Sequence, residues 1–141
     1  MRRSVGAAVV AVALLGAGTA SAQAAVYEGH FRGQPSSSVS LTFVKQNGKR
    51  FLDQIELHYT TTCEDGPTNQ SLGPGALSPR PRVHHGHFKY VAPNVEPPAV
   101  LRIAGDLKPG GKAVGTFRYY ANFGPPHGIC DTGNLEWVAF K

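Results

Sequence analysis

The sequence predicts an all-β protein, an antiparallel β-sandwich or jelly roll of about seven strands, with no helix in the mature chain. From Val26 onward, β-branched and aromatic residues alternate with polar residues and are separated by Gly, Pro and Asn. The same region shows no sustained helical periodicity, and parallel strands would need helices for their crossovers. Short strands with long Gly/Pro-rich connections therefore favour antiparallel pairing.

The first 24 residues are typical of a secretory signal peptide. An arginine pair precedes a small-apolar run from Val5 to about Gly18, and small residues follow it. This run of about 14 residues is shorter than the roughly 17 to 25 that span a bilayer as a helix, so a retained anchor is the less favoured reading. Cleavage can follow Ala22 or Ala24. We expect a secreted protein with a single domain over 25–141 and no membrane span.

The charge balance excludes some function classes. The chain has 14 Lys and Arg against 9 Asp and Glu, which gives +5, and removal of Arg2 and Arg3 leaves 12 minus 9, or +3. Scattered cations with so small a surplus do not predict a nucleic-acid-binding protein. No nucleotide or metal motif is complete, so we expect no cofactor.

After a first strand over 26–31, residues 39–43 and 55–59 predict a half-buried hairpin. A two-residue turn would place Leu41 opposite a polar residue, whereas a three-residue loop with Gly48 in the left-handed region places it opposite Ile55. The apolar pairing favours the longer loop.

The segment from Glu64 to Arg80 contains three prolines and three glycines and few apolar residues. It exceeds ordinary loop length, and disorder is favoured over a binding loop. A strand over 83–91 follows, and a proline-rich connection covers 92–98.

A second hairpin is predicted around Pro109-Gly110-Gly111. A three-residue loop pairs Ile103 with Phe117 and sets Gly105 opposite Gly115. Two facing strand glycines indicate a bend or a close approach. The last strand, 135–140, is apolar on both faces and is expected to be internal, which places Trp137 in the core rather than on a sugar-binding platform.

The two cysteines are expected to pair. An exported protein meets an oxidising environment, and neither Cys63 nor Cys130 has the local signature of a reactive thiol. The bridge would close a loop of about 68 residues and stabilise the fold by about 4 kcal/mol in the chain-entropy model.

The mature chain resembles small exported all-β domains of unknown function that are common in high-GC Gram-positive and related bacteria. The resemblance rests on Cys63 with its acidic turn, Gly86-His87-Phe88, Gly115-Thr116-Phe117, Cys130-Asp131-Thr132-Gly133 and Trp137-Val138-Ala139. It implies a fold and assigns no catalytic residues.

Two groups of residues are candidate metal ligands. His85 and His87 would share one face of a strand and, with a third histidine, could hold zinc or copper. Asp65 and Asp131 follow the two cysteines, so a bridge would draw them together in a way that suits calcium. The competing interpretations are a solvent-facing histidine row and ordinary Asp-Gly turn chemistry.

Exposed aromatic residues beside the loop of 122–129, Tyr120 and Phe123, are the candidate ligand-binding residues. No nucleophile elbow, zinc-protease motif or phosphate loop is present. We therefore expect a non-catalytic binding or envelope-associated module with an extracellular or cell-envelope ligand. A small metal-dependent or hydrolytic enzyme using His84, His85 and His87 is the alternative, and a purely structural protein is a third reading.

Overall fold

The computed structural model describes residues 23–92 and 99–141, and every regular element in them is a strand. The nine strands are β1 (Gln23–Phe31), β2 (Ser38–Gln46), β3 (Lys49–Cys63), β4 (Gly66–Ala76), β5 (His87–Val91), β6 (Ala99–Lys108), β7 (Lys112–Asn122), β8 (Ile129–Asp131) and β9 (Leu135–Phe140). The expected signal peptide lies outside the described residues except for Gln23 and Ala24, which begin β1.

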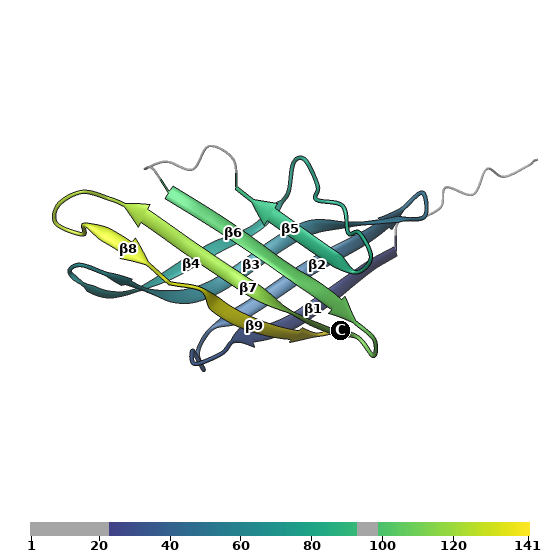
Figure 1. Ribbon diagram of the computed structural model, residues 1–141, viewed down its shortest axis with the longest axis horizontal. Coiled ribbons are helices and arrows are strands. Elements are labelled where there is room, and N and C mark those ends of the chain that lie inside the picture. The colour runs from purple at the N-terminus through teal and green to yellow at the C-terminus, as the bar shows by residue number, and fades with distance from the viewer. Residues whose placement is uncertain (1–22, 93–98) are drawn as a thin grey trace, which may run out of the picture.

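The sheet closes on itself (Figure 1). All pairings are antiparallel, and the strand order is β4-β3-β2-β1-β9-β7-β6-β5. Strand β8 pairs with β3 on one side and β7 on the other, which closes a ring of β3, β2, β1, β9, β7 and β8. Strands β4, β5 and β6 lie outside that ring. The all-β prediction is confirmed, whereas a sandwich of seven strands is wrong: the described residues form a closed barrel of six strands with three further strands beside it. Its described part contains no helix that could cross a membrane.

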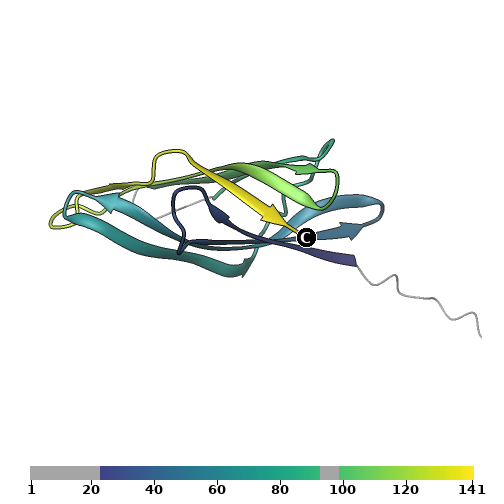
Figure 2. The same cartoon turned by 90° about the horizontal axis from the view of Figure 1, so that it is seen from below.

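The barrel is flattened, so that two layers face each other (Figure 2). Aromatic rings fill the space between them: Phe43 and Phe88 approach to 5.2 Å between ring centroids, and Tyr59 and Phe117 to 4.8 Å. Phe31 also packs on Phe117. Burial of such rings is the main stabilising contribution in a domain of this size.

The first hairpin has the predicted register, but a different turn produces it. Leu41 faces Ile55 as expected, and Gly48 has the expected positive φ of 72°. The turn itself contains only two residues, because Gln46 pairs with Lys49. A bulge supplies the missing residue: Thr42 pairs with Gln54 and Phe43 with Leu52, leaving Asp53 unpaired in β3.

The second hairpin follows the prediction. Ile103 pairs with Phe117 and Gly105 with Gly115, around the loop Pro109-Gly110-Gly111. The two glycines make room for the indole of Trp137, since a Cβ at Gly105 would lie 2.5 Å from Trp137 Cζ2. Trp137 is 1% exposed in β9, which pairs with β1 and β7. The internal last strand and the buried tryptophan are confirmed.

Most of the segment expected to be disordered is strand β4. Cys63 pairs with Gly66 across a two-residue turn, and β4 then follows β3 to Ala76. Its prolines are tolerated because β4 is an edge strand, where one row of backbone N–H groups needs no partner. Its composition resembles a loop because β4 contributes almost no side chain to the core.

Beyond β4 the chain stays against the bulged end of β3. The Leu77 N–H donates to the Asp53 carbonyl, the Leu52 N–H to Pro81 and the Val83 N–H to Arg50. Arg80 Nε lies 2.6 Å from Asp53 Oδ1, and this ion pair fixes the connecting loop to the bulge.

Candidate functional site

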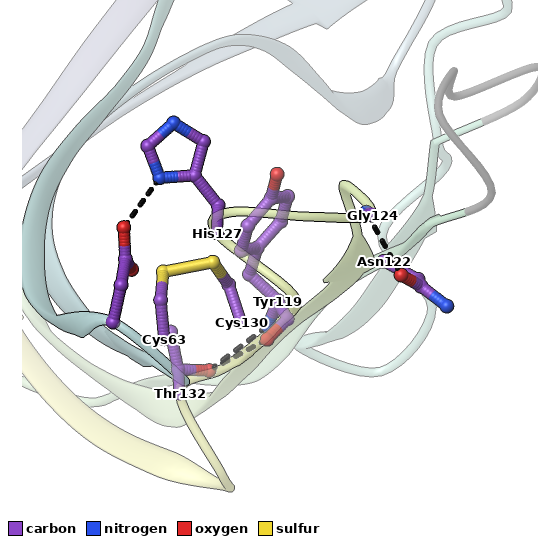
Figure 3. Close-up of a disulfide and its surroundings, with 8 residues drawn as sticks. Cys63, Tyr119, Asn122, Gly124, His127, Cys130 and Thr132 are labelled. Carbon is purple, nitrogen blue, oxygen red and sulfur yellow. Dashed lines mark hydrogen bonds and ion pairs between the residues drawn. A yellow bond between two sulfur atoms is a disulfide. The ribbon is translucent and has the colours of Figure 1, made fainter.

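The disulfide closes the barrel (Figure 3). Cys63 and Cys130 are directly opposite each other on β3 and β8, and they are bonded as predicted. Strand β8 is only three residues long. Because so short a strand offers few backbone hydrogen bonds, the covalent bridge is the strongest connection between β3 and β8.

The acidic residues beside the disulfide have separate partners. Asp65 Oδ2 lies 2.6 Å from His127 Nδ1, whereas both carboxylate oxygens of Asp131 accept hydrogen bonds from the guanidinium of Arg118. Those hydrogen bonds from Arg118, helped by the Gly133 N–H, hold the pKa of Asp131 below its usual value. The two carboxylates therefore make separate loop contacts, and among the described residues they belong to no group of three or more possible ligands that could hold calcium.

Replacement of Arg118 by Gln should raise the pKa of Asp131 towards the ordinary aspartate value of about 4. In the folded protein the carboxyl has the lower pKa, so its pairing stabilises the fold above the unfolded-state pKa, and this contribution is lost as pH falls through the folded pKa. NMR titration of the Asp131 carboxyl carbon measures the shift. An unchanged pKa in Arg118→Gln would contradict the assigned cause.

The histidine cluster is a turn rather than a strand face. His84 and His87 form a bridge across His85 and Gly86, whose φ values of 49° and 79° are those of a tight hairpin turn. Strand β5 therefore starts only at His87, whose Nδ1 lies 3.0 Å from Asp106 Oδ1. His85 and His87 do not share a strand face, and within residues 23–92 and 99–141 no group of three or more His, Cys, Asp or Glu could hold a metal ion.

The candidate aromatic residues are only partly available. Phe123 is 38% exposed next to the loop that leads to β8, and Tyr120 is half-buried at the end of β7, opposite Asp131. Neither lines any of the hollows described below.

A polar hollow of about 340 Å³ on the outer face of β3 and β4 contains a chain of hydrogen bonds. His58 Nδ1 lies 2.9 Å from Ser71 Oγ, and His58 Nε2 lies 3.3 Å from Glu56 Oε1. The connectivity is that of a Ser–His–acid triad, but the His58 side chain is 48% exposed. Water screens such an array and competes for its hydrogen bonds, so we interpret it as cross-strand pairing on a solvated sheet face.

Cations gather at the end of the barrel where β1 begins and the chain ends. Figure 1 shows the start of β1, the β2–β3 turn and the C-terminus at that end, and the β3–β4 and β7–β8 turns at the other. Inward-facing positions along β1, β2, β3 and β9 hold core residues such as Tyr27, Leu41, Leu52 and Ala139. One or two inward positions further on, these series end in polar or charged residues, and we name the three cations among them the cationic mouth: Lys45, Arg50 and Lys141.

The bulge in β3 places Arg50 in the cationic mouth. In an unbroken strand, Ile55 and Asp53 would face inward, and the alternation would then turn Arg50 outward. Because Asp53 is an extra residue, the alternation shifts by one, Leu52 faces the core and Arg50 pairs directly with Lys45. Bulges commonly re-aim a side chain in this way beside functional sites.

The mouth encloses a hollow of about 380 Å³ with an apolar floor. Phe43, which is 1% exposed, and Ala25 form part of this floor, and Lys45, Arg50 and Lys141 lie around it. Among the described residues, none of these three cations forms an ion pair. Three cations around one concave site give it a positive potential, which attracts oxyanions.

Sequence reasoning missed this site because its cations come from β2, from β3 and from the residue after β9, and each looks like an ordinary surface cation. The direct opposition of Lys45 and Arg50 depends on the bulge, since a three-residue loop would have placed Lys45 opposite Phe51. Like charges that face each other across a strand pair are destabilising. With the correct register, the sequence would have shown this unfavourable pair and so indicated the site.

Comparisons with protein-family models, with curated proteins and with solved structures found no match to this chain.

Proposed function

We propose that the protein is an exported, non-catalytic binding module that holds an acidic group of an extracellular or cell-envelope ligand in the cationic mouth. The observation that carries this proposal is the convergence of Lys45, Arg50 and Lys141 on one hollow with no Asp or Glu side chain among its lining residues.

The fold supports binding at the mouth rather than inside the barrel. The interior is filled by aromatic and aliphatic side chains, several of them fully buried. Small barrels packed in this way bind ligands at their ends or on their outer faces. The Lys141 N–H donates to the Gly111 carbonyl at 2.7 Å, which anchors the third cation beside the other two.

The chemistry of the mouth fits a carboxylate or a phosphodiester. Arg50 offers a planar fork of donors that matches the two oxygens of such a group, and the lysines add rotatable charged donors. The three cations are exposed, so each contributes only a modest amount to binding. Weak binding of one acidic group is therefore expected, and a ligand with several such groups would bind more tightly.

Calorimetric titration with trigalacturonate, a short carboxylate ligand, tests this proposal. The variant Lys45→Gln/Arg50→Gln should bind about tenfold more weakly than the unaltered protein, because it loses two exposed ion pairs of up to about 1 kcal/mol each. The matched control is Arg32→Gln/Lys112→Gln, which removes the same charge from positions that do not line the hollow.

The control variant should keep its affinity, and the trigalacturonate should be recovered intact. Equal losses in both variants would show that only net charge matters and would contradict a site at the mouth. Failure of the unaltered protein to bind would contradict the proposal as a whole.

A further inference from the structure

The cationic mouth is one end of a longer series of cations. Arg82 follows directly, because it forms a bridge with Phe51, the residue after Arg50 in β3, and the next N–H, that of Val83, donates to the Arg50 carbonyl at 2.9 Å. Arg80 precedes it in the same segment. The segment with Arg80 and Arg82 thus runs beside β3 next to the mouth, with Arg82 on the face of Phe51, which is opposite to the face of Arg50.

From Arg80 the series passes to β5. Arg80 and Lys89 line one open hollow of about 380 Å³ together with Pro79, Pro81, Tyr90 and Val91. This hollow is largely apolar apart from its two cations. Lys89 also lines the next hollow, so the two hollows share a side chain.

The second hollow, of about 350 Å³, lies on the outer face of β5, β6 and β7 and contains Lys89, Arg102 and Arg118. Arg102 and Arg118 are directly opposite each other in the β6–β7 pair. Asp131 compensates Arg118, whereas Lys89 and Arg102 form no ion pair with any described residue. Opposed arginines cost stability in the free protein, and a bound anion would relieve that cost.

Resting on the function proposed above, we propose that the ligand is a linear acidic polysaccharide, bound along a track from the mouth to the β5–β7 face. We define this track by its cations outside the mouth: Arg82, Arg80, Lys89, Arg102 and Arg118. Successive carboxylates of one polymer chain would occupy the mouth and the β5–β7 hollow, and the sugar rings between them would lie on the apolar surface of Pro79, Pro81 and Tyr90.

Sugar rings fit this track better than nucleotides. The apolar hollow at its centre offers proline and valine side chains, which suit the C–H faces of sugars, and Tyr90, half-buried, is its only aromatic residue. Single-stranded nucleic acid is usually held by several aromatic side chains that stack on successive bases. Two cations of the track, Arg80 and Arg118, form ion pairs with Asp53 and Asp131. These pairs lower the net positive charge of the track, which suits a polymer with one charge per sugar.

Binding of polygalacturonate, measured by affinity electrophoresis and calorimetry at fixed salt, tests the track separately from the mouth. The variant Lys89→Gln/Arg102→Gln should lose about tenfold in affinity for the polymer and keep its affinity for trigalacturonate, which occupies the mouth alone. The control Arg32→Gln/Lys112→Gln should resemble the unaltered protein with both ligands. Fully methyl-esterified polygalacturonate has the same backbone without charge and should not bind.

Unchanged polymer affinity in Lys89→Gln/Arg102→Gln, with trigalacturonate still bound at the mouth, would overturn the track and leave the proposed function standing. The track would also be overturned if one polymer chain bound no more tightly than one molecule of trigalacturonate. If an oligothymidylate of the same total charge bound as tightly as polygalacturonate, the polysaccharide assignment would be wrong. If the unaltered protein does not bind trigalacturonate, the proposed function itself is wrong.

Discussion

Replacing both bridged cysteines by alanine should lower the free energy of unfolding by about 4 kcal/mol. The bridge joins residues separated by 67 positions, and the chain-entropy model gives that value for a loop of this length. In this barrel the bridge also holds β8 against β3, where only two residue pairs are in register. Urea unfolding of Cys63→Ala/Cys130→Ala, followed by circular dichroism, measures the loss.

Reduction of the unaltered protein by a thiol reagent is the matched control, and it should give the same decrease as the double variant. A loss below about 1 kcal/mol would contradict the role of the bridge in closing the ring. The variant Thr62→Ala, next to Cys63 but with an exposed side chain, should change stability by less than about 0.5 kcal/mol.

Replacing Gly115 by alanine should cost about 3 kcal/mol, at the upper end of what overpacking a core usually costs. A Cβ at this position would lie 2.6 Å from Trp137 Cζ2 and 2.7 Å from the Gly105 Cα, and it would overlap the Ala104 carbonyl oxygen. The backbone of β6 cannot retreat without breaking β6–β7 pairing, and the indole is fully buried. Thermal or urea unfolding, followed by Trp137 fluorescence, reports both the stability and the position of the indole.

The control for this substitution is Gly75→Ala in the edge strand β4, where an added Cβ meets nothing within 4 Å. That variant should be neutral or slightly stabilising, because alanine reduces the freedom of the unfolded chain. Equal effects at Gly75 and Gly115 would show that chain entropy, and not the fit around Trp137, determines the cost.

Local patterns in the sequence were sufficient for much of the fold. Alternation of apolar and polar residues gives the two hairpins, and apolar pairing selects the register in both. The expectation of export predicts the Cys63–Cys130 bond, and the facing glycines predict a close approach that the indole of Trp137 provides. Each of these inferences depends on residues that are near in sequence or chemically distinctive.

The missed elements lack such a local signal. Strand β8 contains three residues, too few for a periodic pattern, yet it closes the ring. Strand β4 pairs through its backbone while its side chains stay mostly outside the core, so its composition is that of a loop. The bulge at Asp53 gives the same register as a longer turn for Leu41 and Ile55, and only the positions nearer the turn distinguish the two arrangements.

The candidate site depends on one of these missed features. Without the bulge, Arg50 would face away from Lys45, and the cations of the β2–β3 hairpin would appear to be solvated surface charges. The histidine and acidic clusters, in contrast, were conspicuous in sequence, but their side chains make separate contacts in the described residues, because His85 lies in a turn and Asp65 and Asp131 have different partners. A cluster in the sequence was therefore a poor guide to convergence of side chains in the barrel.

The most direct test of the cationic mouth is a map of amide chemical shifts in ¹⁵N-labelled protein as trigalacturonate is added. We expect the largest changes on Lys45, Arg50 and Lys141 and on residues that line the same hollow. Changes concentrated instead around His58 and Ser71, around Phe123, or spread evenly over all exposed cations would contradict binding at the mouth.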